Sequence, residues 1–467
     1  MQLVWFRNDL RIADNTALSQ ARQQGSCLAI YFISLQQWQL HKDAPAKIDF
    51  QLRNLQLLQE SLSALNIPLI VLEVDRWHQI PEKLTEFCLQ LKITQVHCNQ
   101  ESPLNEQTRD KNCADSLAQQ GIAFHAYQDH LLFKPGTLVT QKGDYFQVFS
   151  QFKKACLKRI QTDLVESQRA VTPQAPIKLH GKNLTNTLAQ LSVATEIAAS
   201  YPAGEAYAQQ QLEQFTTSEI YSYHEQRDFP ALQGTSRLSA YLNSGVLSIR
   251  QCLRSALFAN QGELFSGEQG VLCWINELLW REFYHHILQG HPKLSRGYPF
   301  RDKTQFIQWR QAPDELAAWQ TGNTGFPLVD AAMRQLKATG WMHNRLRMVT
   351  AMFLSKNLLI NWRAGEHWFM QHLVDGEFAA NNGGWQWSAS TGTDSVPYFR
   401  LFNPITQSQR FDPKGTFIRH WLPELASLSD KSIHQPSTTE RQRLNYPQPI
   451  VDLAFSRERV MQAFKAI

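Results

Sequence analysis

The first 130 residues alternate between short apolar runs and amphipathic stretches. The apolar runs lie at residues 3–6, 27–33, 68–74, 93–98 and 122–127, and the amphipathic stretches include residues 47–65 and 105–120. Short apolar strands joined by helices predict a parallel sheet covered on both faces, that is, a Rossmann-like α/β N-terminal domain. Ligands of such sheets bind at the carboxyl ends of the strands. No Gly-x-Gly-x-x-Gly follows the first run, which argues against a nicotinamide dinucleotide site.

The periodicity weakens between residues 131 and 200. Pro173, Pro176 and the polar run Gly-Lys-Asn-Leu-Thr-Asn at residues 181–186 predict a long connection here. Beyond residue 200, apolar positions recur three and four residues apart, notably in residues 271–288, 328–336 and 345–359. This spacing predicts a large all-α C-terminal domain. We therefore expect an α/β domain at 1–130, a connection at 131–200 and a helical domain at 201–467.

The composition favours a soluble intracellular protein. A hydrophobic fraction of 43% supports a full core. The seven cysteines form no Cys-x-x-Cys pair, which predicts a reducing compartment, here the cytoplasm, and no metal site. The sequence has no secretory signal and no apolar run long enough to cross a bilayer, so we expect no membrane contact. A formal charge of +5 is compatible with nucleic acid binding but does not demand it.

Residues 375–387 gather amide, glycine and indole groups. Adjacent glycines at 383 and 384 let the backbone adopt positive φ or approach a flat ligand closely. The amides of Asn381 and Asn382 offer directed hydrogen bonds, and Trp385 and Trp387 offer large ring surfaces. This combination suits the wall of a site for an aromatic heterocycle. The alternative is a helix end broken by glycine, with both tryptophans in the core.

A second motif, Gly-Thr-Ser-Arg-Leu-Ser at residues 234–239, follows Arg-Asp-Phe-Pro at 227–230. Hydroxyl groups and free backbone N–H groups ahead of a helix bind phosphate well, and Arg237 could add charge-assisted hydrogen bonds. The alternative is an ordinary helix N-cap.

A third motif places four functional side chains on one helical face. Glu277, Trp280, Arg281 and Tyr284 are spaced at i, i+3, i+4 and i+7. A carboxylate, two aromatic rings and an arginine are poor core material but suit a cleft that stacks a base and hydrogen-bonds its edge. The alternative is a surface face with a Glu–Arg pair.

A fourth motif is Trp-Met-His-Asn-Arg-Leu-Arg-Met at residues 341–348. Asn344 and Met348 share a helical face, with Arg347 beside them, whereas Arg345 points elsewhere and could reach a DNA phosphate. The alternative for Met348 is core packing, the usual role of methionine.

These four motifs, in this order, resemble those of DNA photolyases of the cryptochrome/photolyase family. The resemblance runs from Leu-Val-Trp-Phe-Arg-Asn-Asp-Leu-Arg at the start to Tyr-Phe-Arg-Leu-Phe-Asn-Pro at residues 398–404. It is strongest to the bacterial class I photolyases for cyclobutane pyrimidine dimers that carry a folate antenna. It implies an enzyme that uses light and reduced FAD to split such dimers after they flip out of DNA. It also implies a monomer that acts on damaged DNA and needs no protein partner.

The resemblance assigns roles to individual residues. The FAD-binding residues would be Tyr223, Thr235, Ser236, Arg237, Leu238, Ser239, Trp274, Glu277, Arg281, Asn344, Arg347, Asp375, Glu377 and Asn381, with Asn381 near flavin N5 and Asp375 paired with Arg347. The family usually has Asp where this chain has Glu377. Trp385, Trp362 and Trp309 would pass electrons from the surface to the flavin. The DNA-binding residues would be Arg227, Trp280, Arg281, Arg345 and Arg400.

The substrate site implied by the resemblance consists of Glu277, Trp280, Asn344, Met348 and Trp387. The two indoles would stack on the dimer, and Glu277 would hydrogen-bond a dimer carbonyl where negative charge grows. Photolyases for six-four photoproducts have His where this chain has Asn344 and Met348. A pair without a group that titrates near neutral pH fits cyclobutane dimers instead.

The resemblance also implies an antenna site. His41, Asn105, Glu106 and Arg296 match positions that hold 5,10-methenyltetrahydrofolate, although relatives often have Lys in place of Arg296. The alternatives are a deazaflavin, an empty site, or a plain helix N-cap at residues 105–106. The rival to repair is a signalling photoreceptor of the cryptochrome type, which would use the same FAD and tryptophans. The short sequence after the helical domain and the intact substrate residues argue against that rival.

Overall fold

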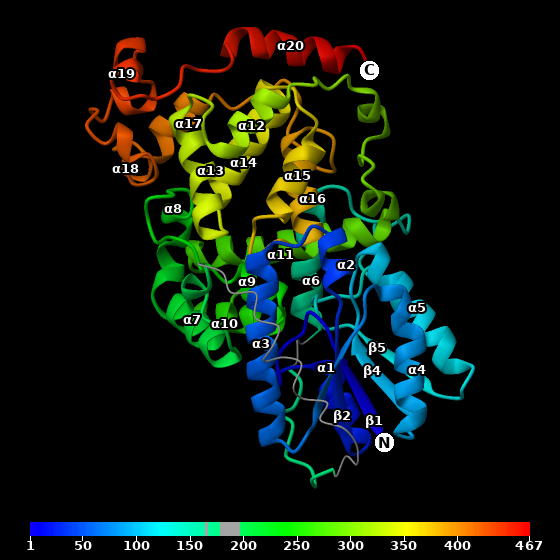
Figure 1. Cartoon of the computed structure of the whole chain (residues 1–467). Helices are drawn as coiled ribbons and strands as arrows, with labels where there is room; N and C mark the ends of the chain where they lie inside the picture. The colour runs from blue at the N-terminus through cyan, green and yellow to red at the C-terminus, as the bar shows by residue number, and fades with distance from the viewer. Residues whose placement is uncertain (164–166, 178–196) are drawn as a thin grey trace. The chain divides into compact units, whose positions relative to one another are not determined.

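A computed structural model describes residues 1–163, 167–177 and 197–467 of the chain (Figure 1). The contacts divide these residues into two compact units. Unit 1 comprises Met1–Phe146, Ser150–Tyr221 and Ser236–Pro292, and unit 2 comprises Gln147–Phe149, Ser222–Thr235 and Lys293–Ile467. The polar run 181–186 lies outside the described residues. These units are defined by contacts between residues and do not test domain boundaries. The predicted domain boundaries at residues 130 and 200 therefore remain a prediction.

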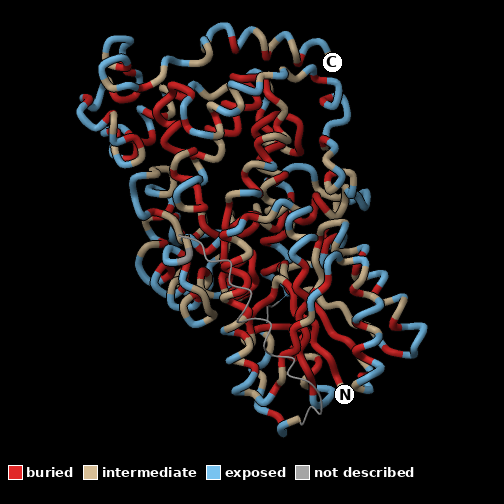
Figure 2. Tube along the Cα trace, viewed as in Figure 1, coloured by how far each residue is buried: buried red, intermediate tan, exposed pale blue. Residues whose placement is uncertain are grey.

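Unit 1 contains a five-stranded parallel sheet in the order β3-β2-β1-β4-β5. The strands are β1 Gln2–Phe6, β2 Cys27–Ile33, β3 Leu69–Glu73, β4 Gln95–Asn99 and β5 Ala123–Tyr127. The two strands β1 and β2 are buried along their whole length, as Figure 2 shows in red. This confirms the predicted α/β fold. Because the strand order reverses at β1, the carboxyl ends of β1 and β4 flank a point where ligands of such sheets bind.

Helices connect the strands of unit 1. They are α1 Thr16–Gln24, α2 Leu35–Leu40, α3 Pro45–Ala64, α4 Ile80–Gln90 and α5 Leu104–Ala118. Asn15 caps α1 by accepting a hydrogen bond from the backbone N–H of Leu18, which satisfies a donor at the helix start. On α4 and α5, Leu84 and Cys113 pack with Trp5 of β1 in one hydrophobic core cluster. Helices α4 and α5 thus cover one of the two faces that the sequence pattern predicts to be covered.

The rest of unit 1 is helical. Its helices are α6 Phe149–Thr162, which begins at the last residue of the short unit 2 segment, α7 Glu205–Thr217, α9 Ser239–Asn243, α10 Ile249–Ala259 and α11 Gln269–Gly290. Buried ion pairs tie α10 to the sheet: Arg250 donates to Asp14 and, at 2.7 Å, to Asp129. Although burial raises it, the pKa of Asp129 is held well below its ordinary value by Arg11 and Arg250. This network fixes α10 beside the carboxyl edge of the sheet.

Unit 2 is helical as predicted, and no strand longer than an isolated bridge occurs in its described residues. Its helices are α8 Tyr223–Gln226, α12 Pro313–Thr321, α13 Pro327–Thr339, α14 Asn344–Met352, α15 Trp362–Met370, α16 Phe378–Ser388, α17 Pro404–Phe411, α18 Thr416–Trp421, α19 Thr438–Arg443 and α20 Leu453–Lys465. Its largest core cluster joins residues of α12 to α16, including Trp319, Trp362 and Trp385.

The local sequence explains where these helices begin and end. Pro313, Pro327 and Pro404 occupy first turns, where a missing N–H costs nothing. Gly322 and Gly340 end α12 and α13 in the left-handed region, at φ 68° and 66°. Within the described part of the chain, no helix has the length and apolar character needed to span a bilayer.

Candidate functional site

The predicted cleft-lining motif lies on α11 of unit 1. Its four members, namely Glu277, Trp280, Arg281 and Tyr284, are all half-buried. On the opposite side of the helix, Leu279 and Phe283 are fully buried. The predicted helix and its mixed face are therefore present. The indole of Trp280 lies 5.6 Å from the Tyr284 ring centroid, so the exposed side of α11 offers a continuous aromatic surface.

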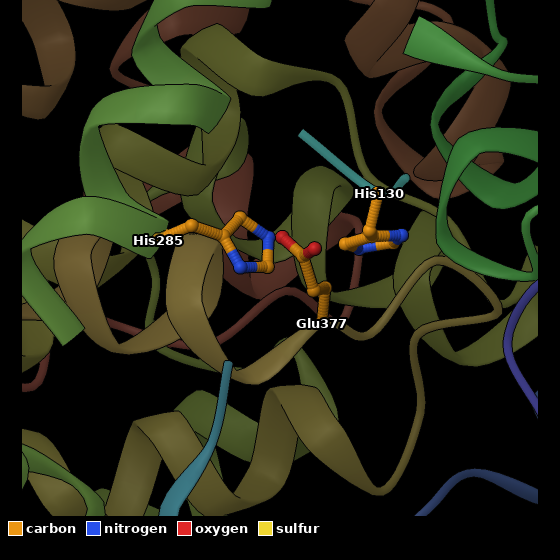
Figure 3. Close-up of side chains that lie close together, drawn as sticks. All are labelled: His130, His285 and Glu377. Carbon is orange, nitrogen blue, oxygen red and sulfur yellow. The ribbon is translucent and has the colours of Figure 1, made fainter. Parts of the chain in front are cut away.

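Arg281 is anchored by the segment that follows β5. Its Nη1 donates to the backbone carbonyl of His130 at 3.0 Å, and its Nη2 contacts the His130 ring. The His130 and His285 rings meet edge to face with centroids 5.1 Å apart (Figure 3). Glu377, also labelled in Figure 3, belongs to unit 2 and is the N-cap residue of α16. Trp274, one turn before Glu277, is buried against Phe215. The orientation of the Arg281 guanidinium is thus fixed within unit 1.

The Gly-Thr-Ser motif begins with a glycine that the packing requires. A Cβ at Gly234 would lie 2.6 Å from Cβ of Gln226. Arg237 has a φ of 51°, a left-handed conformation that is uncommon for a residue with a side chain. The motif spans both units, because Tyr223 and Thr235 belong to unit 2, whereas Ser236, Arg237, Leu238 and Ser239 belong to unit 1. The following helix α9 has only five residues, so hydroxyl groups rather than a helix dipole would make any phosphate contact.

The fourth motif forms the start of α14. Asn344 is exposed and Met348 half-buried on this helix, so Met348 is not a core residue. Nη2 of Arg347 lies 3.0 and 2.8 Å from the two carboxylate oxygens of Asp375, which confirms the expected pair. Nε of Arg347 donates to the carbonyl of Met342. Since the Asp375 carboxylate is almost fully buried, this pair compensates a charge that would otherwise be costly.

The two glycines of the Asn-Asn-Gly-Gly run do not adopt positive φ. Residues 383 and 384 lie inside α16, which continues without a break through Trp385 to Ser388. Of the two roles that the sequence allows for these glycines, positive φ is not adopted, because packing of the surrounding helix overrides the low helix propensity of glycine. A Cβ at Gly384 would meet no atom within 4 Å. The glycine therefore leaves open space on α16, which fits close approach of a flat ligand.

A chain of amides and one carboxyl group fixes the side chains of α16. Nδ2 of Asn381 donates to the backbone carbonyl of Glu366, and Nδ2 of Asn382 donates to Oε1 of Glu366 at 2.7 Å. Nε2 of Gln386 donates to Oδ1 of Asn382. Burial raises the pKa of Glu366 to about 7, against the opposing effect of the Asn382 hydrogen bond. Oδ1 of Asn381 has no partner among the described residues, so a ligand N–H group would fit it.

The three tryptophans expected to carry electrons lie in unit 2 and share its core. Trp385 and Trp362 are 2% and 1% exposed, whereas Trp309 is half-buried and packs against the same cluster. A Cβ at Gly365 would lie 2.0 Å from Cη2 of Trp385, so only glycine fits there. The buried Nε1 of Trp385 has no partner in the described structure. Burial thus increases from Trp309 to Trp362 and Trp385, as expected for an electron path that leads from the surface to the interior. Trp387 of the substrate motif is half-buried.

The arginines expected to bind DNA differ in their surroundings. Arg400 is exposed. Arg227 and Arg345 have side chains that are 21% and 18% exposed, and both lie near the carboxylate of Asp228. Sequence reasoning missed Asp228 because its partner Arg345 is far away along the chain. It also missed Lys356, a buried lysine that donates to the carbonyls of Pro397 and Arg400; burial lowers its pKa to about 7.

The residues expected at the antenna site lie near the carboxyl edge of the sheet in unit 1. Nδ2 of Asn105 and Nε2 of His41 are 3.1 Å apart. The His41 ring meets Trp77 edge to face with centroids 4.8 Å apart. Pro103, not Asn105, is the N-cap residue of α5, so residues 105–106 are not a plain N-cap. Arg296 belongs to unit 2, where it is exposed.

Glu106 is the most unusual of the antenna residues. Burial, with the nearby Glu101 charge, raises its pKa to about 8, and its buried Oε2 has no hydrogen-bond partner among the described residues. Glu101 contrasts with it: burial opposes ionisation, but Arg109, 2.6 Å away, lowers the Glu101 pKa to about 2. A buried oxygen without a protein partner could take a hydrogen bond from the N–H group of a ligand.

Comparisons with known proteins show the family of the chain. The family model described as DNA photolyase matches residues 2–174, and the one described as FAD binding domain of DNA photolyase matches residues 274–466. The chain is 43% identical to the deoxyribodipyrimidine photo-lyase of Escherichia coli over 99% of this chain and 98% of that protein. It is also 43% identical to the protein of the same name from Vibrio cholerae over 100% of this chain and 99% of that one.

Two solved structures share the fold along the whole chain. A class III photolyase from Agrobacterium tumefaciens superposes with a TM-score of 0.86 at 31% identity, covering 100% of this chain and 97% of that one. A cryptochrome from Synechocystis superposes with a TM-score of 0.88 at 29% identity, covering 99% of each chain. The fold is thus common to repair enzymes and cryptochromes, but the sequence likeness is greater to the former. The chain belongs to the DNA photolyase family.

Proposed function

We propose that the protein repairs cyclobutane pyrimidine dimers in DNA by a light-driven reaction that uses reduced FAD. The observation that carries this proposal is the 43% identity, over nearly the full length, to relatives named deoxyribodipyrimidine photo-lyase. When bound, reduced FAD supplies an electron on absorbing light and takes it back once the cyclobutane bonds have broken. We also propose that the protein acts as a cytoplasmic monomer without a protein partner.

The residues present fit FAD. The open space at Gly384, the unpaired Oδ1 of Asn381 and the unpaired Nε1 of Trp385 support a flat ligand with hydrogen-bonding edges beside α16. The Arg347–Asp375 pair would align a further donor and acceptor with the ring. The hydroxyl groups and backbone N–H groups of residues 235–239, with the Tyr223 hydroxyl, would hold the phosphates. Trp274, Glu277, Arg281, Asn344 and Glu377 would complete the FAD contacts.

The substrate side is proposed from side chains that are at least partly accessible. Trp280 and Trp387 would stack on the flipped-out dimer, and Glu277 would donate to or accept from its edge. Asn344 and Met348 offer an amide and a soft apolar surface but no group that titrates near neutral pH. That chemistry supports cyclobutane dimers rather than lesions that need proton transfer from histidine. Arg227, Arg281, Arg345 and Arg400 would hold backbone phosphates in a salt-dependent way.

We propose 5,10-methenyltetrahydrofolate as the antenna. The unpaired Oε2 of Glu106 supports a ligand with an N–H edge, which the pterin ring of this folate has. The side chains of His41 and Asn105 are in contact, which supports the proposal that both meet the same ligand. Arg296 would add a cation to the site. Trp309, Trp362 and Trp385 would carry electrons inward when oxidised flavin is reduced by light.

A repair assay tests the proposal. Purified protein with reduced FAD is incubated with dimer-containing DNA, once in the dark and once under near-UV or blue light, and the remaining dimers are measured. We expect loss of dimers only in the light. The likeness to a cryptochrome supports the rival, a signalling photoreceptor, as the second candidate. DNA that keeps all its dimers after illumination would favour that rival and reject repair.

A further inference from the structure

An acid lies among the arginines that are proposed to contact DNA. Oδ2 of Asp228 is 2.8 Å from Nη2 of Arg345, and its Oδ1 is 4.0 Å from Nε of Arg227. The Asp228 side chain is 34% exposed, so water reaches this group of charges. A carboxylate beside phosphate-binding cations weakens the attraction for any DNA, damaged or not. We therefore looked for a role of Asp228, beside Arg227 and Arg345, that compensates for the lower affinity for DNA.

Three contacts fix the Arg345 guanidinium. Besides the ion pair with Asp228, its Cζ lies 4.5 Å from the ring centroid of Phe411, and its Nη1 lies 3.8 Å from Sδ of Met348. Phe411 is itself buried and meets the ring of Phe229 edge to face. Because the guanidinium stacks on the Phe411 ring and one of its edges is held by the Asp228 carboxylate, its plane is fixed. Arg345 is thus held beside Met348, one of the proposed substrate residues.

The segment that carries Asp228 is rigid. It follows α8, and the N–H groups of Arg227 and Phe229 donate to the carbonyls of Tyr223 and Gln226. Gly234 packs so closely on Gln226 that a Cβ would not fit. The Arg227 guanidinium stacks on the Tyr223 ring at 5.3 Å. Asp228 therefore holds Arg345 from a fixed base rather than from a mobile loop.

We propose that Asp228 is a specificity-determining residue, which holds Arg345 beside Met348 for the DNA backbone at a flipped-out lesion and lowers affinity for undamaged DNA. This inference rests on the proposed function. In undamaged DNA, the backbone is regular and gains only from positive charge, so Asp228 opposes binding. At a lesion, the distorted backbone meets a guanidinium that is already oriented, so the loss of rotamer freedom on binding is smaller. The carboxylate therefore lowers the affinity for undamaged DNA more than the affinity for damaged DNA, which raises the preference for damaged DNA.

The test compares Asp228→Asn with the natural protein on two duplexes of identical sequence, one with a single dimer. Binding is measured in the dark at several salt concentrations. We expect the affinity for undamaged DNA to rise about three- to tenfold and its salt slope to steepen by about one, since one more phosphate is neutralised. The affinity for the dimer duplex should rise less or fall. The preference for damage should therefore drop at least about threefold.

Glu225→Gln is the matched control. Glu225 lies three residues before Asp228, its side chain is 71% exposed, and its Oε1 lies 3.7 Å from Nε2 of His224. This variant removes the same charge from the same segment without touching Arg345, and should leave the preference unchanged. Asp228→Glu keeps the charge and should keep the low affinity for undamaged DNA. Thermal unfolding of each variant checks that the fold is retained.

Two results would overturn the inference. In the first, Asp228→Asn and Glu225→Gln change both affinities by the same factor, which is a general charge effect. In the second, Asp228→Asn leaves both affinities as they were. Failure of the proposed function looks different, since the natural protein itself would then bind both duplexes equally and repair neither in light.

Discussion

Glu106 in unit 1 and Glu366 in unit 2 are buried carboxyl groups with different partners. Burial is the main cause of the raised pKa in both, about 8 for Glu106 and about 7 for Glu366. Oε1 of Glu366 accepts a hydrogen bond from Asn382, whereas Oε2 of Glu106 has no partner among the described residues. A buried acceptor without a partner costs free energy that a satisfied one does not. Glu366 therefore orients the protein's own amides, whereas a buried oxygen of Glu106 is left without a protein partner, which supports the antenna ligand that we propose.

The largest expected effect concerns the proton on Glu366. Its pKa rises from the ordinary value of 4.5 to about 7 in the folded protein. Between these values, the folded state keeps a proton that the unfolded state loses, so stability falls as pH rises through this window. Glu366→Gln removes that dependence, so its stability relative to the natural protein should improve by up to about 3 kcal/mol from pH 4.5 to pH 8. Urea unfolding at several pH values measures it. Parallel stability curves for the two proteins would show that Glu366 does not hold this proton.

The packing beside Glu366 gives the next largest effect. Gly365→Ala would place a Cβ against the Trp385 ring and should destabilise the protein by about 2 kcal/mol, a typical cost of overpacking. Gly384→Ala is the control, because its Cβ meets no neighbour and alanine favours helices; it should be neutral or slightly stabilising. Thermal unfolding of the flavin-free proteins compares them, because a Cβ at Gly384 would enter the space proposed for the flavin. Equal melting temperatures for the two variants would contradict the packing around Trp385.

The smallest expected effect concerns the ligand of Glu106. Glu106→Leu removes the proposed hydrogen bond between this carboxyl group and the ligand, and should weaken binding of 5,10-methenyltetrahydrofolate about tenfold. Because the pKa of Glu106 is about 8, the carboxylate fraction, and with it the affinity for an N–H donor, should rise as pH increases from 7 to 9. Glu106→Gln should bind with no such pH dependence. Folate absorbance titrations measure both the loss of affinity and its pH dependence. If the folate affinity of the natural protein does not change between pH 7 and 9, the proposed role of Glu106 is contradicted.

Much of the fold and part of the site could be predicted from the sequence. The parallel sheet and the mixed face of α11 follow from local periodicity, which one stretch of chain carries by itself. The Arg347–Asp375 pair followed only from the family resemblance. The ion pair of Asp228 with Arg345 could not be predicted, because it joins distant segments whose approach depends on tertiary packing. The sequence left two roles open for Gly383 and Gly384, and only the structure shows that both residues stay helical, because packing of α16 outweighs local propensity.

The buried charges also escape sequence reasoning. Lys356 and Glu366 look like ordinary surface residues in the sequence, yet both are buried and have pKa values displaced to about 7. A burial this complete depends on neighbours from other helices, such as Asn382 of α16 for Glu366. Only the three-dimensional structure shows that these groups have amide or carbonyl partners.

Time-resolved fluorescence of the bound reduced flavin tests the central claim most directly, namely that an electron passes from this flavin to a pyrimidine dimer. The lifetime is measured for the protein alone, with an undamaged duplex, and with the same duplex carrying one dimer. We expect a shorter lifetime only with the dimer, because electron transfer to the lesion competes with emission. An identical lifetime with both duplexes, when binding of each is saturated, would contradict it.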